Sequence, residues 1–411
     1  MGYRIAVLHQ GFVPTYRKAF FELLNRTSTS EYVVFHGDPP GDSGLVAAAE
    51  PYDFPNVRVV NREIPIGRWR AIWQPVVRQI ARGDYDAVVL GHEVKFLSNL
   101  TLAALFRMRR RSVLLWGFGF HVKMGIGYRN KASATLARAT GLVKDAIARR
   151  VDGYLAYTDR GAEALRLAGV PDDRIWVIRN TIDIAEQCEL HDRLADADEA
   201  ALRRELGLKP DSVVFLFLGR LVEAKRAEEA IEAVIRLNEE ARTRHPVELV
   251  VIGGGPKQAE LASRYAGRPG ILLRGRIPEE ETVARYMRVA SALLLPGYVG
   301  LAVNHAFAHG LPVITRRHEL HSPEVEYIED GRSGLIIDGD FRAFVSELAG
   351  LADDPGRLQR LAAGALEARE GLRLESMVTR FDEAVTATIG RQRSGPAWRR
   401  KSETDRRAAG A

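Results

Sequence analysis

The chain alternates short apolar runs with longer stretches of helical periodicity. In its first half the apolar runs begin at Arg4, Tyr32, Val57, Ala87, Ser112, Gly153 and Ile175. Each run is almost continuously apolar, which is typical of a strand buried on both faces of a parallel sheet. Because helical stretches separate the runs, residues 1–180 predict a doubly wound α/β domain.

The same pattern restarts after a polar, acidic join that begins at Asn180. Residues 181–373 therefore predict a second doubly wound domain, and ligands of such sheets gather beyond the carboxyl ends of the strands. We expect the two domains to face each other across a cleft. A last helix over 374–390 is expected to return to the first domain. Residues 391–411 lack apolar periodicity and predict a basic, disordered tail.

Composition narrows the class of protein. No stretch of the 411 residues approaches the roughly 18 apolar residues of a membrane span, and the first residues do not resemble a signal peptide. The single cysteine, Cys188, excludes a disulfide within the chain and a cysteine-rich metal site. These features predict a cytoplasmic protein.

Charge is distributed unevenly along the chain. Residues 1–180 hold 26 Lys and Arg against 16 Asp and Glu, whereas residues 181–390 hold 26 against 35. A basic first half favours an anionic partner, and a negatively charged membrane surface is the partner we expect. A solvated arginine-rich surface is the alternative. No nucleic-acid-binding motif accompanies the charge, so we expect no nucleic acid.

Two basic residues follow the first strand of the second half. Arg220 ends the strand, and Lys225 stands five residues later where a helix begins. Beside the unpaired N–H groups of a helix N-terminus, they suit a diphosphate. The alternative is a surface arginine and an ordinary helical lysine. The nearby "VIGGGP" lacks the GxGxxG spacing of a dinucleotide-binding turn.

The stretch "LLLPGYVGLAVNHAFAHGLPVIT", residues 293–315, is arranged as strand, glycine turn, helix and strand. This is the layout of a phosphate-binding turn, yet no carboxylate occurs within it. With "GR…K", "VIGGGP", "RGRI" and "DGRSGLII", it resembles the family 4 glycosyltransferases, which use nucleotide sugars with retention and have the two-domain GT-B fold. "VPTYRKAFFELL" and "WGFGFH" resemble a bacterial branch that builds surface polysaccharides.

The resemblance implies a donor site in the second domain. In this interpretation Arg220 and Lys225 hold the donor diphosphate and support its departure. The other donor-binding residues that it implies are Gly11, Arg276, Ile277, Gly297, Gly300, Leu301, His305 and Glu326. The implied substrates are a nucleoside-diphosphate sugar and a glycan or lipid-linked glycan acceptor, without a cofactor.

The chain departs from this family at two positions. The family's two glutamates, eight residues apart, align with Gly297 and His305. Retaining transfer can proceed without them, because the leaving diphosphate can assist deprotonation of the acceptor while cations stabilise its charge. A buried structural histidine is the alternative role for His305.

Polar residues also follow strands of the first half. His121, after "WGFG", is our choice for the acceptor-side catalytic residue, with His9, His92 and Lys123 as further acceptor-side candidates. Each histidine could equally be satisfied by neighbouring backbone. The triplets "DYD" at 84–86 and "DGD" at 338–340 have the letters of an acidic metal-binding motif, but the first leads into a strand and the second lies in a turn. We therefore expect no metal.

The sequence thus predicts a glycosyltransferase of the GT-B fold, acting in surface polysaccharide synthesis at the inner face of the plasma membrane. Two alternatives stay open. One is a non-catalytic sugar-nucleotide binder or partner subunit, suggested by the missing glutamates. The other is a sugar-nucleotide epimerase, which would need no acceptor.

Overall fold

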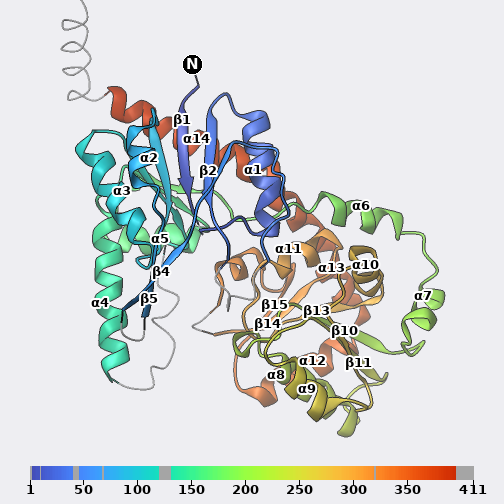
Figure 1. Ribbon diagram of the computed structural model, residues 1–411. Coiled ribbons are helices and arrows are strands. Elements are labelled where there is room, and N and C mark those ends of the chain that lie inside the picture. Colours follow the sequence, from blue (N-terminus) through green and yellow to red (C-terminus); the bar gives the residue numbers. More distant parts are fainter. Residues whose placement is uncertain are drawn as a thin grey trace, which may run out of the picture. The chain divides into compact units, whose positions relative to one another are not determined.

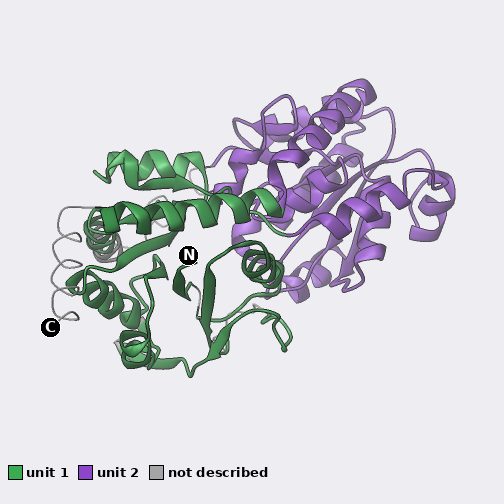
Figure 2. Ribbon diagram, turned by 90° about the horizontal axis from the view of Figure 1, so that it is seen from above, with its two compact units in different colours: residues 1–182, 374–411 green, residues 183–373 purple. Residues whose placement is uncertain are grey.

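The computed structural model describes residues 2–9, 11–39, 46–66, 69–119, 131–318 and 321–394. The chain divides into two compact units, which Figure 2 colours separately. The first contains the chain up to Ile182 and again from Leu374, and the second contains Asp183–Arg373. Each unit is a parallel sheet with helices packed on it, as predicted (Figure 1).

The first unit is built on a seven-stranded parallel sheet of order β3-β2-β1-β6-β7-β8-β9. Its chain reverses direction across the sheet beside β1, which is the doubly wound order. The strands are β1 (Arg4–Leu8), β2 (Glu31–His36), β3 (Asn56–Arg58), β6 (Ala87–Gly91), β7 (Ser112–Gly117), β8 (Gly153–Ala156) and β9 (Ile175–Val177).

Helices cover both faces of this sheet, so alternate residues of each strand enter different cores. Ile5 and Val7 of β1 pack in one cluster, and Ala6 and Leu8 pack in the other. The helices are α1 (Thr15–Thr27), α2 (Val77–Arg82), α3 (Leu97–Met108), α4 (Lys131–Ala148), α5 (Asp159–Leu167) and α14 (Leu374–Ser394). Burial on both faces explains why the strands read as continuous apolar runs.

The C-terminal helix α14 packs in the first unit, against α1 and the sheet. It runs to Ser394, four residues beyond the end at 390 that the sequence predicts. Arg391 Nη1 lies 3.1 Å from Asp173 Oδ2, and Arg393 pairs with Asp86. These ion pairs extend the helix into the basic segment. The rest of the predicted disordered tail lies outside the described residues.

A two-stranded antiparallel hairpin, β4 (Arg62–Ile66) and β5 (Trp69–Trp73), was not predicted. Arg62 pairs with Trp73, and Pro65 pairs with Arg70. Charged residues and a proline interrupt the apolar alternation here, which hides a strand from pattern analysis. The strand predicted to start at Val57 is also shorter than expected, because β3 ends at Arg58.

The second unit repeats the doubly wound plan with a six-stranded parallel sheet of order β12-β11-β10-β13-β14-β15. Its strands are β10 (Val213–Leu218), β11 (Val247–Ile252), β12 (Ile271–Gly275), β13 (Ala292–Leu294), β14 (Val313–Arg316) and β15 (Gly334–Ile337). Its longer helices are α6 (Ala185–Arg193), α7 (Glu199–Leu206), α8 (Ala227–Glu239), α9 (Gln258–Tyr265), α10 (Glu280–Val289), α11 (Ala302–Ala308), α12 (Phe341–Ala352) and α13 (Pro355–Arg369). Its described residues also form three short 3-10 helices, η3 (Glu223–Lys225), η4 (Pro323–Tyr327) and η5 (Glu370–Leu372).

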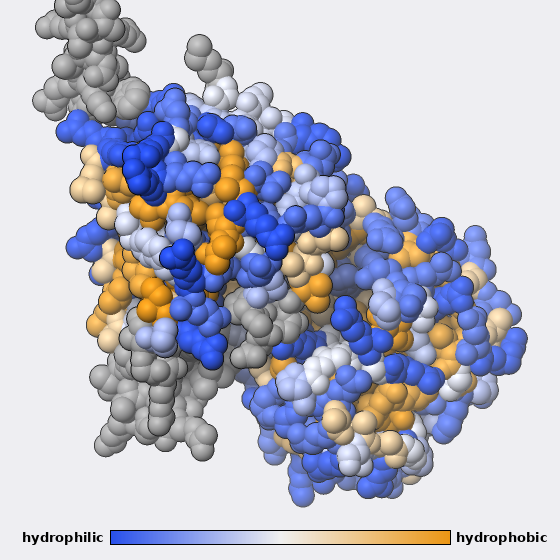
Figure 3. Space-filling model, in the orientation of Figure 1, coloured by the Kyte–Doolittle hydropathy of each residue, from blue (hydrophilic) through white to orange (hydrophobic). Residues whose placement is uncertain are grey.

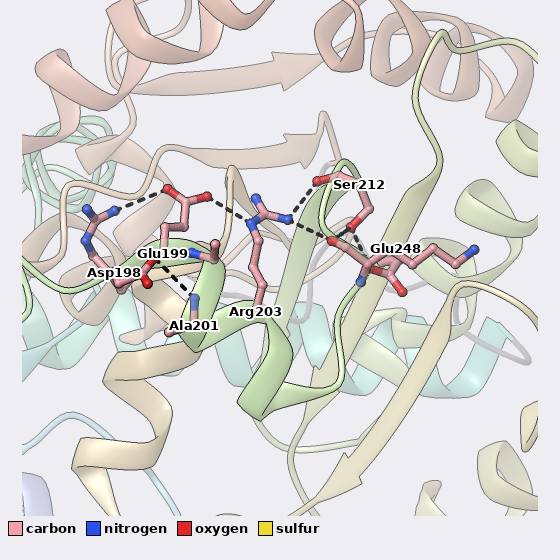
Figure 4. A network of polar contacts seen from close by, with 9 residues as sticks. Asp198, Glu199, Ala201, Arg203, Ser212 and Glu248 are labelled. Atoms are coloured by element: carbon pink, nitrogen blue, oxygen red, sulfur yellow. Dashed lines mark hydrogen bonds and ion pairs between the residues drawn. The ribbon is translucent and has the colours of Figure 1, made fainter.

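A buried carboxylate fixes the entry into this sheet. Glu248 of β11 is 4% exposed and accepts hydrogen bonds from Ser212 Oγ at 2.5 Å and Lys209 N at 2.9 Å. Arg203 of α7 donates to the Ser212 carbonyl at 3.0 Å and to Glu199 Oε1 at 2.9 Å (Figure 4). The polar join predicted from the sequence is therefore helical and anchored to the sheet.

None of the helices within the described ranges has the length and apolar content that crossing a bilayer requires.

We predict that Phe381→Ala destabilises the first unit by about 3–5 kcal/mol, the usual cost of removing a buried phenylalanine ring. Phe381 of α14 is fully buried, with ring centroids 5.2 Å from Phe20 and 4.9 Å from Trp116. No tryptophan occurs between residues 183 and 373, so tryptophan fluorescence during urea unfolding reports the first unit.

Thr379→Ala, on the exposed side of the same helix, is the matched control and should change the unfolding free energy by less than about 0.5 kcal/mol. If the two variants unfolded at the same urea concentration, α14 would not be part of the core of the first unit.

Candidate functional site

The carboxyl ends of β10 and β11 lie unusually close together in the second unit. A Cβ atom added to Gly253 would lie 1.9 Å from the Gly219 carbonyl oxygen, and one added to Gly255 would lie 2.6 Å from that of Leu221. Gly219, Gly253 and Gly255 have positive φ angles. Glycine is therefore required in the "VIGGGP" turn for close backbone packing.

Lys225 joins two loops at this edge of the sheet. It ends η3, and its Nζ donates to the carbonyl oxygens of Tyr298 at 3.0 Å and Val299 at 2.9 Å. In the opposite direction, Tyr298 N donates to the Ala224 carbonyl at 2.8 Å. The cation is thus held in the loop between β13 and α11, which the sequence identified as a phosphate-binding turn.

The environment of Lys225 is poor in water. Burial lowers the pKa of Lys225 to about 8, and the negative charge of Glu324 opposes this shift. An anion bound next to this side chain would stabilise its charged form. The site therefore has the electrostatic character that an anionic ligand needs.

Glu324 is the residue that the sequence analysis missed. It lies in η4, is 4% exposed, and its charge also raises the pKa of Tyr298, although burial of Tyr298 contributes more. The loop at 293–315 has no carboxylate of its own, but η4 brings one to it. Glu326, which the sequence analysis chose, is half-buried two residues further along. Ser322 before Pro323 marks the start of a helix, but no pattern distinguishes the two glutamates.

Gly297 has no room for a side chain. An added Cβ would lie 2.2 Å from the Ala224 carbonyl oxygen and 2.9 Å from the Lys225 carbonyl carbon. Contacts below 3.0 Å with backbone require the backbone to move. The glycine at this position is therefore part of the packing that places Lys225.

Gly300 and Leu301 lead into α11. Gly300 has a φ of +61°, and its N–H donates to Ser322 Oγ at 2.7 Å. Leu301 is half-buried and precedes the first residue of the helix. The N–H of Gly300, one of the implied donor-binding residues, is thus bound by the Ser322 hydroxyl in this structure.

His305 lies in α11 and interacts electrostatically with Glu280 of α10. Burial lowers its pKa, and the charge of Glu280 opposes the shift. Its neighbour His309 is 6% exposed and lies 3.0 Å from Gln187 Oε1, and Gln187 Nε2 donates to Glu280 Oε2 at 2.8 Å. Burial lowers the pKa of His309 to about 3. Both imidazoles are therefore uncharged at neutral pH.

The remaining donor-side residues lie at strand ends. Arg220 is exposed directly beyond β10, and Arg276 is exposed directly beyond β12. Ile277 is half-buried against the core. Arg220, Arg276 and Ile277 therefore lie in loops at the carboxyl ends of strands, where ligands of such sheets bind. Residues of these loops can contact a ligand without contacting one another.

In the first unit, His121 and Lys123 lie outside the described residues. Gly11 has a φ of +80°, and its carbonyl accepts from Gly37 N at 2.6 Å and Asn61 Nδ2 at 2.9 Å. His92 has both ring nitrogens engaged, Nδ1 with Tyr154 Oη at 2.7 Å and Nε2 with the Lys144 carbonyl at 3.2 Å. This pattern favours a structural role for His92.

His9 differs from His92 because only one of its ring nitrogens, Nε2, has a hydrogen-bond partner among the described residues. Its ring stacks on Trp116 at 3.9 Å, and Nε2 lies 3.1 Å from Tyr157 Oη. Burial, and secondly the positive charge of Arg17, hold the pKa of His9 well below its usual value. Among the described residues, no three His, Cys, Asp or Glu side chains are grouped closely enough to hold a metal ion.

Residues 212–354 match the family described as "Glycosyl transferases group 1". The matched residues all lie in the second unit. They include Lys225, the turn at 293–315 and Glu324. The match thus falls on the part of the chain where the sequence analysis expected the donor site.

Curated glycosyltransferases are similar to about half of the chain. The chain is 31% identical over 244 residues to a "D-inositol 3-phosphate glycosyltransferase 2" of Catenulispora acidiphila, covering 56% of this chain and 54% of the relative. It is 32% identical over 243 residues to a "D-inositol 3-phosphate glycosyltransferase" of Streptomyces bingchenggensis, covering 56% and 51%. The chain spans about half the length of the curated relatives it matches.

Solved structures share the fold over nearly the whole chain. Anabaena Alr3699/HepE in complex with UDP and glucose superposes with a TM-score of 0.65 at 15% identity, covering 94% of this chain and 100% of that one. Sucrose-phosphate synthase of Thermosynechococcus elongatus gives 0.67 at 17% identity, covering 94% and 99%. A putative UDP-N-acetylglucosamine 2-epimerase of Listeria monocytogenes gives 0.55 at 15% identity, covering 95% and 98%. The fold is GT-B, and a protein described as an epimerase shares it.

We predict that Gly297→Ala destabilises the second unit by about 1–3 kcal/mol, the usual cost of forcing extra atoms into packed structure. The displaced backbone would be that of Ala224 and Lys225. Hydrogen exchange should accelerate in peptides covering 223–226 and 297–301, because the variant separates the two loops.

Gly350→Ala is the matched control. Gly350 lies in α12 with nothing within 4 Å of an added Cβ, so alanine should be neutral or slightly stabilising there. Unchanged exchange in the Gly297→Ala loops would show that the close contact with Ala224 is not maintained in solution.

Proposed function

We propose that this chain is a retaining glycosyltransferase that transfers a sugar from a nucleoside-diphosphate sugar to a hydroxyl of a glycan or lipid-linked glycan. The observation that carries the proposal is Lys225, a half-buried cation held by the carbonyls of Tyr298 and Val299 inside a glycosyl transferases group 1 region. A diphosphate bound there would replace weak carbonyl contacts with full charges.

The chemistry requires charge stabilisation more than proton transfer by the protein. The bond between the anomeric carbon and the diphosphate oxygen breaks, and a bond from the acceptor oxygen to the same carbon forms on the same face. The acceptor proton passes to the departing diphosphate. Lys225, with Arg220 at the end of β10, would stabilise the negative charge that the diphosphate gains.

This mechanism is compatible with the packing at Gly297. A carboxylate cannot occupy that position unless the backbone of Ala224 moves. The transferred sugar would instead be held by backbone groups of the 293–315 loop, and His305 would offer an uncharged ring to the donor ribose. Arg276 and Ile277 would contact the base through their backbone.

The solved neighbours suggest a donor to test first. Alr3699/HepE was crystallised with UDP-glucose, and the curated relatives are named for D-inositol 3-phosphate. For this chain we propose a uridine or related nucleoside-diphosphate sugar as donor, without a metal cofactor, and a lipid-linked glycan of surface polysaccharide synthesis as acceptor. D-inositol 3-phosphate belongs in the acceptor set because of those names.

One experiment separates this proposal from its alternatives. The protein is incubated with UDP-, GDP- and ADP-sugars, with and without acceptors, and released nucleoside diphosphate and sugar products are measured by mass spectrometry. A glycosyltransferase releases diphosphate in proportion to a new glycoside. A sugar-nucleotide binder raises the melting temperature without product, and an epimerase converts the donor without any acceptor.

We predict that Lys225→Met and Arg220→Ala each reduce turnover at least 100-fold, about 2.7 kcal/mol of transition-state stabilisation. Lys209→Met, which removes an exposed lysine of the same unit, is the matched control and should retain near-normal turnover. Near-normal rates for both site variants would refute the diphosphate assignment.

Donor affinity should also depend on pH through Lys225. The pKa of about 8 lies below the usual value of a lysine, so the free site loses its charge as the pH rises through 8. Binding of UDP, measured by calorimetry, should therefore weaken by up to about tenfold per pH unit above 8. Lys225→Met should bind weakly with no such slope between pH 7 and 10, and a wild-type affinity that is flat over this range would contradict the assignment.

We further propose that the protein associates peripherally with the inner face of the plasma membrane. Exposed basic residues cluster at the end of α3 beside Met108, which is 75% exposed. On α4, Leu142 is 68% exposed and Val143 is 51% exposed. Figure 3 shows apolar residues interspersed with hydrophilic ones on the visible face of the molecule. Such a surface combines charge attraction with shallow apolar contact.

We predict that the protein binds vesicles containing anionic lipid and not neutral vesicles, and that binding falls steeply between low and high salt. Each Lys or Arg near such a surface contributes about 1 kcal/mol, and the attraction fades beyond about 8 Å at physiological salt. Replacing Arg107, Arg109 and Arg110 by Gln should weaken co-sedimentation. Equal binding to neutral and anionic vesicles would remove the electrostatic argument.

A further inference from the structure

Arg17 of α1 is a buried cation that makes no ion pair with any described residue. It is 1% exposed, and its contacts are the Thr181 carbonyl at 3.1 Å from Nη1, the Met377 sulfur at 3.7 Å from Nη1, and Asn180 Oδ1. Its Nε is buried and has no hydrogen-bond partner. All these partners are uncharged, so the positive charge is not neutralised by any described residue. A cation in that state acts strongly on nearby titratable groups.

An indole ring connects Arg17 with His9. The guanidinium carbon lies 5.1 Å from the Trp116 ring centroid, and the His9 ring stacks on Trp116 at 3.9 Å with an interplanar angle of 23°. The charge of Arg17 adds to burial in disfavouring the protonated form of His9. Arg17 is the one charged group that acts on His9 among the described residues, and Tyr157 is its other titratable neighbour.

His9 makes one hydrogen bond through its ring nitrogens to the described residues. The ring is half-buried, Nε2 faces Tyr157 Oη, and Nδ1 has no partner in the described part of the chain. Phe118 is 41% exposed, and its ring meets that of Tyr157 edge to face at 5.0 Å. His9, Phe118 and Tyr157 follow β1, β7 and β8, so they share the carboxyl edge of one sheet.

These features fit a sugar better than an anion or a metal ion. A pyranose ring offers hydroxyl groups to an uncharged ring nitrogen and a C–H face to an exposed aromatic ring. An uncharged imidazole can donate or accept one hydrogen bond without the desolvation cost that a cation would add.

We propose that His9, Phe118 and Tyr157 form a subsite for an uncharged sugar ring of the acceptor, and that Arg17, which contacts the Trp116 ring on which His9 stacks, is a positioning residue for His9. The proposal rests on the proposed function, because it assigns the acceptor end of the same reaction. It concerns residues of the first unit alone.

Asn180→Asp tests the role of Arg17 with almost no change in shape. The new carboxylate would lie against Nη2 of Arg17 and neutralise its charge, so His9 should gain a proton at higher pH. In ring-labelled protein followed by NMR, the His9 signal should titrate at higher pH than in the wild type. The acid limb of the pH profile of kcat/KM for the acceptor should move to higher pH by a similar amount, about one pH unit.

Two matched variants isolate the charge. Asn180→Ala removes the hydrogen bond without adding charge, and Arg17→Lys keeps a cation, so both should leave the acid side of the profile in place. If Asn180→Asp lowers the melting temperature without moving the His9 titration or the profile, Arg17 is structural and its positioning role is refuted.

The subsite itself is tested by His9→Phe, which keeps a ring on Trp116 and removes both nitrogens. The KM for the acceptor should rise about tenfold or more while the KM for the donor stays constant, and His9→Gln should restore part of the loss. An unchanged acceptor KM in a transferase-active His9→Phe variant would overturn the subsite. Absence of transfer with every donor and acceptor would instead refute the proposed function, and the NMR titration would still decide whether Arg17 acts on His9.

Discussion

Parallel sheets covered on both faces leave few places for polar side chains. The central strands of both units are buried on each side, so a charged residue within such a strand needs hydrogen-bond partners, as Glu248 has in Ser212 and Lys209. The carboxyl edges of the strands are where backbone and side-chain groups can meet a ligand. The donor-side cluster around Lys225 and the His9 cluster both occupy such edges.

Near each edge lies a cation that forms no salt bridge among the described residues: Lys225 in the second unit and Arg17 in the first. The charges of the two residues act on different groups. Lys225 donates to backbone carbonyls, and Glu324 provides a negative charge nearby, so it remains partly charged and responsive to an anion. Arg17 contacts no carboxylate in the described part of the chain and is buried against Trp116. Its charge therefore acts on its neighbour His9, whereas the charge of Lys225 is suited to a ligand.

The fold could be predicted because its information is local. Continuous apolar runs predicted the strands of both sheets. The helical stretches between these runs predicted the doubly wound class, which the strand orders confirm. The β4–β5 hairpin was missed because Pro65 and several charged residues disrupt its alternation. The burial of Glu324 and the partners of Arg17 depend on contacts between residues up to 360 positions apart, which no local pattern reveals.

The missing glutamate at position 297 and the placement of Lys225 are two consequences of one contact. Tyr298 N binds the Ala224 carbonyl, and this hydrogen bond draws the two loops so close that only glycine fits at 297. The same approach brings the Tyr298 and Val299 carbonyls within reach of Lys225. A glutamate side chain at 297 would push apart the loops that hold the cation. The 293–315 loop has no carboxylate of its own, and its charge is therefore set by two neighbours, Lys225 from η3 and Glu324 from η4.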